Sequence, residues 1–178
     1  MASIEYKSKK IETRRGDISH QPDLEAIVNA ANAMLLPGSG VAGAIHSAAG
    51  NQLAEECRHL APISPGQAVI TSGYNLPNRY VIHTLGPVFG RDKPEAEILA
   101  NCYKNSLTLC TQKKIRSIGF PAISTGVFGY PVEEAAQIAI RTIKETIDSN
   151  PIYPEHIVIV LFTAKDKEIH DLVLKKIF

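Results

Sequence analysis

The chain has 178 residues, of which 44% are hydrophobic and 21% charged. This composition is typical of a globular protein and excludes a disordered or fibrous one, and the length predicts one domain over residues 1–178. The formal net charge of +1 lacks the basic excess that nucleic-acid-binding domains usually carry, so we expect no specific nucleic-acid partner.

Strands and helices are predicted to alternate along the chain. The expected strands cover residues 4–13, 24–28, 67–72, 79–84, 117–121 and 157–162. The expected helices cover residues 41–60, with a break at Gly50, the stretch from Pro94 through Cys110, the stretch from Pro131 through Ile147, and residues 166–177. This alternation predicts an α/β fold in which helices cover both faces of a sheet, a three-layer α/β/α sandwich.

The three cysteines, Cys57, Cys102 and Cys110, show no C-x-x-C spacing. They are typical of reduced cysteines and indicate neither a disulfide framework nor a zinc site. The sequence has no N-terminal leader pattern and no apolar run of membrane-spanning length. We therefore expect a cytoplasmic monomer with no membrane partner, no metal and no cofactor, although a nuclear location stays open.

A glycine-rich segment follows the predicted strand that ends at Val28. Asn-Ala-Ala-Asn comes directly after this strand, and Gly38, Gly40 and Gly43 then precede a helical apolar pattern. Exposed backbone amides at the start of a helix favour negative charge. This segment therefore predicts a ligand that contains phosphate.

A second segment, from Ser124 to Pro131, has the same character. Small hydroxyl residues and glycines follow a strand and lead into a helix. Two such loops at the carboxyl ends of strands indicate one crevice for a pyrophosphate. A simple turn before the helix is the alternative, but Phe128 between the glycines then lacks a packing partner, whereas a sugar or base would provide one.

Residues 38–43 also match the dinucleotide-binding pattern G-x-G-x-x-G. In that fold the first glycine follows the strand directly, and an acidic residue ends the next strand. Here Asn29 to Pro37 separate the strand from the glycines, and Glu55 and Glu56 fall inside the predicted helix. The context disfavours a Rossmann dehydrogenase.

Five motifs in order resemble those of the macro domain family, and in particular its MacroD-type branch. They are Gly16-Asp17-Ile18, IVNAAN from Ile27 to Asn32, GVAGAIHSAAG from Gly40 to Gly50, VIHTLGP from Val81 to Pro87, and FPAISTGVFGYP from Phe120 to Pro131. The resemblance implies a mixed, roughly six-stranded sheet in the sandwich. It also implies a crevice for ADP-ribose at one end of the sheet, and mono-ADP-ribosylated proteins as partners.

The resemblance assigns expected roles to single residues. Asp17 would accept the adenine amino group beside the Ile18 amide, and Phe162 would stack on adenine. Alternatively, Asp17 caps a turn and Phe162 belongs to the core. Asn32 would bind the distal ribose, while Asn29 would hold loop backbone. The expected phosphate and distal-ribose loops comprise Gly40, Val41 and Ala42 together with Ser124, Thr125, Gly126, Val127 and Phe128.

One departure from the family pattern bears on chemistry. MacroD-type hydrolases usually carry GGGGVDGAIH, and Ala42 stands at the acidic position of this pattern. The resemblance implies hydrolysis of an ester between ADP-ribose and an acidic protein side chain or a small acyl group such as acetate. Asn32 and His46 are the catalytic candidates, with His46 in a helper or structural role, and His83 is expected to be a core histidine. Because Ala42 carries no carboxylate, a non-catalytic reader of ADP-ribose is the alternative.

Overall fold

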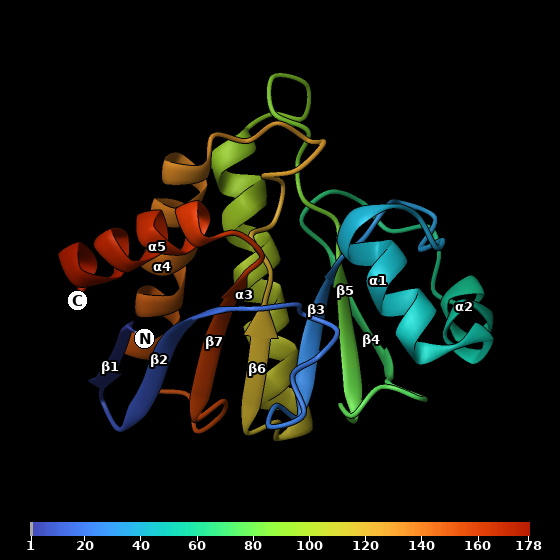
Figure 1. Ribbon diagram of the computed structural model, residues 1–178, viewed down its shortest axis with the longest axis horizontal. Coiled ribbons are helices and arrows are strands. Elements are labelled where there is room, and N and C mark those ends of the chain that lie inside the picture. Colours follow the sequence, from blue (N-terminus) through green and yellow to red (C-terminus); the bar gives the residue numbers. More distant parts are fainter. Residues whose placement is uncertain (1) are drawn as a thin grey trace.

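The fold is organised around one mixed sheet with the strand order β1-β2-β7-β6-β3-β5-β4 (Figure 1). The computed structural model describes residues 2–178. The strands are β1 (Ala2–Tyr6), β2 (Lys9–Arg15), β3 (Ala26–Ala30), β4 (Ala68–Ser72), β5 (Tyr80–Thr84), β6 (Ser117–Phe120) and β7 (His156–Leu161). The helices are α1 (Gly40–Ala49), α2 (Asn51–Arg58), α3 (Glu95–Lys113), α4 (Val132–Asp148) and α5 (Ala164–Ile177).

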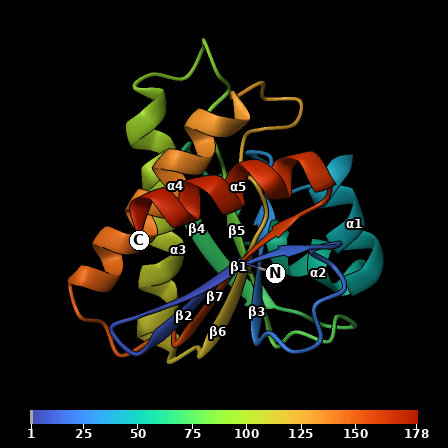
Figure 2. The same ribbon diagram turned by 60° about the vertical axis from the view of Figure 1, so that its left-hand side comes forward.

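Helices cover both faces of this sheet, as the alternating pattern predicts. In β7, Ile157 and Ile159 face a core shared with α3, α4 and α5, whereas Val158 and Val160 face a second core shared with α1 and α2. Figure 2 shows these two groups of helices on opposite sides of the sheet. Neighbouring residues of a central strand are thus buried on opposite faces, which explains its continuous run of apolar residues.

The prediction of one strand over residues 4–13 is wrong, because this segment forms the antiparallel hairpin of β1 and β2. Lys7 and Ser8 make the turn, with φ of 49° and 63°. Two-residue hairpin turns with positive φ usually carry glycine or asparagine, so the sequence gives no signal for this one. The sheet consequently has seven strands rather than about six.

Other boundaries differ less from expectation. The predicted break at Gly50 is confirmed: this residue has φ of 87° and separates α1 from α2. Pro94 is the residue before α3 and not its first residue. In α5, Leu172 is exposed, whereas Val173 and Leu174 are buried.

The three cysteines are free and buried, in agreement with core packing. Burial raises the pKa of Cys57 and Cys102 to about 11, so their thiols stay protonated at neutral pH. In the part of the chain that the structure describes, no helix is long and apolar enough to cross a membrane.

The sheet brings five chain segments together at one edge. The strands β2, β7, β6, β3 and β5 are mutually parallel. The loops that follow them therefore all emerge at the carboxyl edge of the sheet, where open α/β sheets usually bind ligands.

A buried carboxylate in β2 makes the stability of this fold depend on pH. Glu12 accepts hydrogen bonds from Arg14 Nε at 2.9 Å and from His156 Nε2 at 3.0 Å. Burial by itself would raise the pKa of Glu12, but these hydrogen bonds outweigh it and hold the pKa below its usual range.

We expect Glu12→Gln to lower the free energy of unfolding at pH 7 by about 2 kcal/mol, because the substitution weakens charge-assisted bonds to Arg14 and His156. The stabilisation that comes from a lowered pKa is fully present above the ordinary carboxyl pKa. It decreases below that pH and is lost as the pH falls through the pKa of the folded state. Urea unfolding of both proteins at pH 7 and pH 3 checks this. If the two proteins differ in free energy of unfolding by the same amount at pH 7 and pH 3, the prediction is wrong.

Candidate functional site

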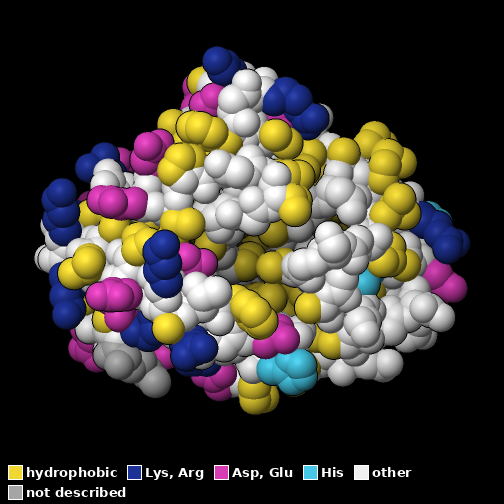
Figure 3. Space-filling view, turned by 45° about the horizontal axis from the view of Figure 1, so that its top comes forward, with side chains coloured by type: hydrophobic (Ala, Val, Ile, Leu, Met, Phe, Trp, Pro, Cys, Tyr) yellow, Lys and Arg dark blue, Asp and Glu magenta, His cyan; other side chains and the backbone are white. Residues whose placement is uncertain are grey.

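A cleft with two lobes lies at the carboxyl edge of the sheet, where Figure 3 shows a hollow with an apolar floor. The wide lobe encloses about 510 Å³ and the narrow lobe about 230 Å³. Both are lined by Gly40, Val41, Ala122 and Gly126, so the two lobes are continuous. The wide lobe is also lined by Gly16, Asp17, Ile18, Ala44, Pro121, Thr125, Val160, Phe162 and Asp166. The narrow lobe is also lined by Ala30, Ala31, Ser39, Gly86, Ile123, Ser124, Val127 and Phe128.

The start of α1 forms one wall of the cleft and presents backbone amides to it. Ser39 is the N-cap residue, and its side chain makes no capping hydrogen bond. Residues 40–42 therefore keep first-turn amides without a partner among residues 2–178. Gly43 lets this segment close tightly, because a methyl group there would overlap the Gly38 carbonyl.

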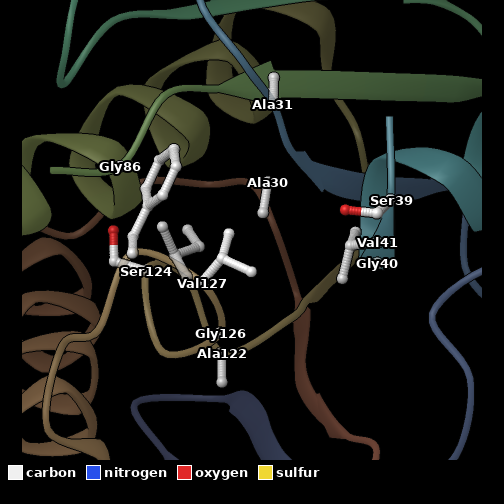
Figure 4. A pocket seen from close by; sticks show the side chains of 12 residues that line it. Ala30, Ala31, Ser39, Gly40, Val41, Gly86, Ala122, Ser124, Gly126 and Val127 are labelled. Carbon is white, nitrogen blue, oxygen red and sulfur yellow. The ribbon is translucent and has the colours of Figure 1, made fainter. Parts of the chain in front are cut away.

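The loop between β6 and α4 forms the opposite wall. It is closed by hydrogen bonds from Tyr130 N to Ser124 O at 2.9 Å and from Gly129 N to Gly126 O at 3.0 Å. No acceptor within the described chain receives the amides of residues 126–128. Figure 4 shows this loop and the Ser39–Val41 segment on either side of the narrow lobe. The two loops thus face each other with free amide donors, an arrangement suited to an anion.

The wide lobe combines a carboxylate with an exposed aromatic ring. Asp17 caps a turn: its Oδ1 accepts from Ser19 N at 2.8 Å and from Ser19 Oγ at 2.7 Å. These hydrogen bonds lower the pKa of Asp17, and its carboxylate still borders the lobe. Both interpretations of Asp17 are therefore compatible. The core interpretation of Phe162 is wrong, because this side chain is 78% exposed beyond the end of β7.

Asp166 is a further residue of the wide lobe that the sequence interpretation missed. Its backbone amide donates to Thr163 Oγ1 at 3.1 Å at the start of α5. The sequence carries this signal as a hydroxyl residue followed three positions later by an acid, which is typical of a helix start. The pattern indicates the cap but not the nearby cleft.

Asn29 in β3 and Asn32 after it have different surroundings from those expected. Asn32 Nδ2 donates to Leu36 O at 2.8 Å, and Asn32 Oδ1 accepts from Leu36 N at 2.9 Å. Its side chain therefore braces the loop beside Ala31, and the cleft walls do not include it. Asn29 does not hold loop backbone but pairs with His83 Nδ1 at 3.1 Å inside the core.

His46 lies in the second turn of α1 and is buried away from the cleft. Its ring centroid is 6.4 Å from that of His83, and burial lowers its pKa, so the ring is neutral at pH 7. His46 does not line either lobe, and its helper or structural role stays a prediction. His83 is a core histidine as expected, with a second bond to Thr71 Oγ1 at 2.9 Å.

Ala42 is likewise buried in α1 and does not line either lobe with its side chain. Its contribution to the cleft is limited to backbone in the first turn. Among residues 2–178, no three His, Cys, Asp or Glu side chains are grouped so that they could hold a metal ion. The cleft offers an anion site built from backbone, with polar and aromatic groups at its wide end.

Comparison with known proteins relates the chain to one family. The family model described as Macro domain matches residues 28–139. A macro domain-containing protein of Chlorobaculum tepidum is 50% identical over 85% of this chain and 88% of its own length. The mouse ADP-ribose glycohydrolase MACROD1 is 46% identical over 92% of this chain, which spans 51% of that protein.

Solved structures agree with these relatives. The Oceanobacillus iheyensis macrodomain with ADP has a TM-score of 0.93 and 41% identity, covering 98% of this chain and 95% of that one. The Trypanosoma brucei macrodomain in complex with ADP-ribose has a TM-score of 0.85 and 37% identity, covering 91% of this chain and 68% of that one. The chain belongs to the macro domain family.

Proposed function

We propose that this protein binds ADP-ribose in the two-lobed cleft and hydrolyses an ester bond at the distal ribose. The observation that carries the proposal is the pair of loops whose unpaired amides face each other between the two lobes. A pyrophosphate presents several acceptor oxygens and negative charge to such donors, and the dipole of α1 adds to the attraction. The ADP and ADP-ribose in structures of similar macrodomains support this ligand.

The adenine end of the ligand fits the wide lobe. The exposed ring of Phe162 offers a stacking surface, and the Ile18 amide has no acceptor within the described residues. Asp17 Oδ1 is engaged by Ser19, while Oδ2 lies 3.5 Å from His20 Nδ1 and can accept from an amino group. The distal ribose then enters the narrow lobe beside Ser124 and Phe128.

Hydrolysis in the narrow lobe requires a positioned water, a base and stabilisation of the leaving group. The reaction consumes water and an ADP-ribosyl ester, and it releases ADP-ribose and a carboxylic acid. Since Ala42 supplies no carboxylate, we assign the base to a phosphate oxygen of the ligand. Asn32 aligns the ribose hydroxyl after its amide turns from Leu36, and His46 supports α1 from inside.

The acid part of the ester is the acidic side chain of a mono-ADP-ribosylated protein or a small acyl group such as acetate. A reader that binds ADP-ribose without hydrolysis is the second candidate, and Ala42 is the observation that favours it. Both candidates require the same binding cleft, so catalysis must be measured separately from affinity.

We expect release of ADP-ribose from a glutamate-ADP-ribosylated peptide above the buffer rate, measured by mass spectrometry. Ala42→Asp puts a carboxylate on a side chain that is buried and lines neither lobe, so we expect a lower melting temperature and no gain in turnover. No release by the original protein, with ADP-ribose still bound, would defeat the hydrolase and leave the reader.

We expect Asp17→Ala and Phe162→Ala each to weaken ADP-ribose binding about tenfold in calorimetry, because each removes a contact to adenine. Asn32→Ala serves as the comparison, since its loss should reduce turnover more than affinity. An unchanged affinity in the Asp17 variant would show that adenine lies elsewhere. Much tighter binding of NAD than of ADP-ribose would contradict the whole assignment.

Gly126→Ala tests how closely the ligand approaches the second loop. A methyl group at Gly126 would meet no atom within 4 Å in the free protein, so its melting temperature should be unchanged. A pyrophosphate bound to this backbone would meet the methyl group, and we expect about tenfold weaker binding. Gly86→Ala is the contrasting variant, because its methyl would overlap Ser124 Oγ and should also lower stability. Unchanged affinity in Gly126→Ala would contradict the placement of the phosphates.

A further inference from the structure

Four exposed apolar side chains lie on the loops that line the narrow lobe. They are Val127 at 93% exposure, Met34 and Leu36 at 53% each, and Phe89 at 40%. We call these four residues the rim. Figure 3, which looks toward this edge of the sheet, shows hydrophobic side chains around the central hollow. Apolar groups gathered at the edge of a binding cleft are typical of a surface that contacts another molecule.

Met34 and Leu36 form one bank of the rim. They lie on the loop between Ala31 and Ser39, both of which line the narrow lobe. Leu35 between them has φ of 54° and is buried, so its two neighbours are turned outward. The buried Leu35 side chain anchors this loop, and in the free protein the paired hydrogen bonds between Asn32 and Leu36 brace it further. Its exposed side chains are therefore held in place by the fold.

Phe89 and Val127 form the other bank. Phe89 N donates to Phe128 O at 2.9 Å, which ties the β5–α3 loop to the wall of the narrow lobe. The Phe89 ring packs against Tyr130 with centroids 4.9 Å apart, and much of its remaining surface is exposed. Val127 itself lines the lobe. This bank is thus continuous with the cleft.

If the proposed function holds, the group that is bonded to the distal ribose of the ligand is what covers the rim. The aromatic ring and carboxylate of the wide lobe place the distal ribose in the narrow lobe, so any group attached to that ribose leaves past the rim. An acetyl group is too short to cover two banks of side chains. A polypeptide attached through an acidic side chain has to pass over them.

We propose that the rim binds the polypeptide of a mono-ADP-ribosylated protein and favours apolar residues next to the modified acid. The inference rests on the proposed function and adds to it a preference for the residues that flank the modified acid. Burying apolar side chains between two partners supplies the affinity. Lys93, exposed on the same loop as Phe89, adds attraction for acidic segments, whereas Arg91 is partly neutralised by Asp92 at 3.5 Å.

The test compares two ligands in binding to the full chain. One is free ADP-ribose, and the other is a peptide with leucine on both sides of a residue that carries ADP-ribose through a non-hydrolysable linkage. We expect the double variant Met34→Ser/Leu36→Ser to bind the peptide about tenfold more weakly and free ADP-ribose as before. Phe89→Ser should behave in the same way if its melting temperature is kept.

Ile152→Ser is the matched control. Ile152 is 75% exposed but precedes β7, so it lies at the opposite edge of the sheet, and its variant should bind both ligands normally. Equal affinity of the Met34→Ser/Leu36→Ser and Ile152→Ser proteins for the peptide would overturn the inference. The inference would also be overturned if the unsubstituted protein bound a peptide with serine on both sides of the modified residue as tightly as the leucine peptide. Failure of the original protein to bind free ADP-ribose would instead defeat the proposed function.

Discussion

The site depends on one constraint: two loops must keep backbone amides without protein partners and hold them facing each other. Gly40, Gly126 and Val127 are exposed, so water can satisfy their amides in the free protein, and the fold has to keep these donors oriented toward the cleft. The parallel pairing of β3 with β6, in the register Ala26 with Ile118, fixes the positions at which both loops begin. The central sheet therefore acts as the rigid element that places the anion site.

Close backbone packing supports the same two loops. Gly43 lies against the Gly38 carbonyl, Gly86 leaves room for the Ser124 hydroxyl, and Gly119 lies against Leu24 and Ile18. Ser124 also holds φ of 67°, a backbone region that residues other than glycine seldom adopt. Strained or crowded backbone of this kind is common at binding sites. The loops are thus shaped before a ligand arrives, which lowers the ordering cost of binding.

Much of this arrangement could be predicted from local patterns. The glycines and small residues after β3 and β6 indicated an anion site, because their effect on the backbone is local. Local patterns could not decide between an outward and a core position for Phe162, because its place one residue past β7 depends on where the strand ends. The same holds for the orientation of His46, which is decided by packing between α1 and the sheet. The β1–β2 turn was missed because Lys7 and Ser8 adopt positive φ without the residues that usually signal it.

The central claim is that both loops bind one pyrophosphate, and backbone amide NMR during titration with ADP-ribose tests it most directly. We predict that the amide resonances of residues 40–42 and of residues 126–128 shift together, with one common binding curve, while the buried Asn29–His83 pair changes little. Shifts confined to one of the two loops, or different midpoints for the two, would contradict a shared pyrophosphate site.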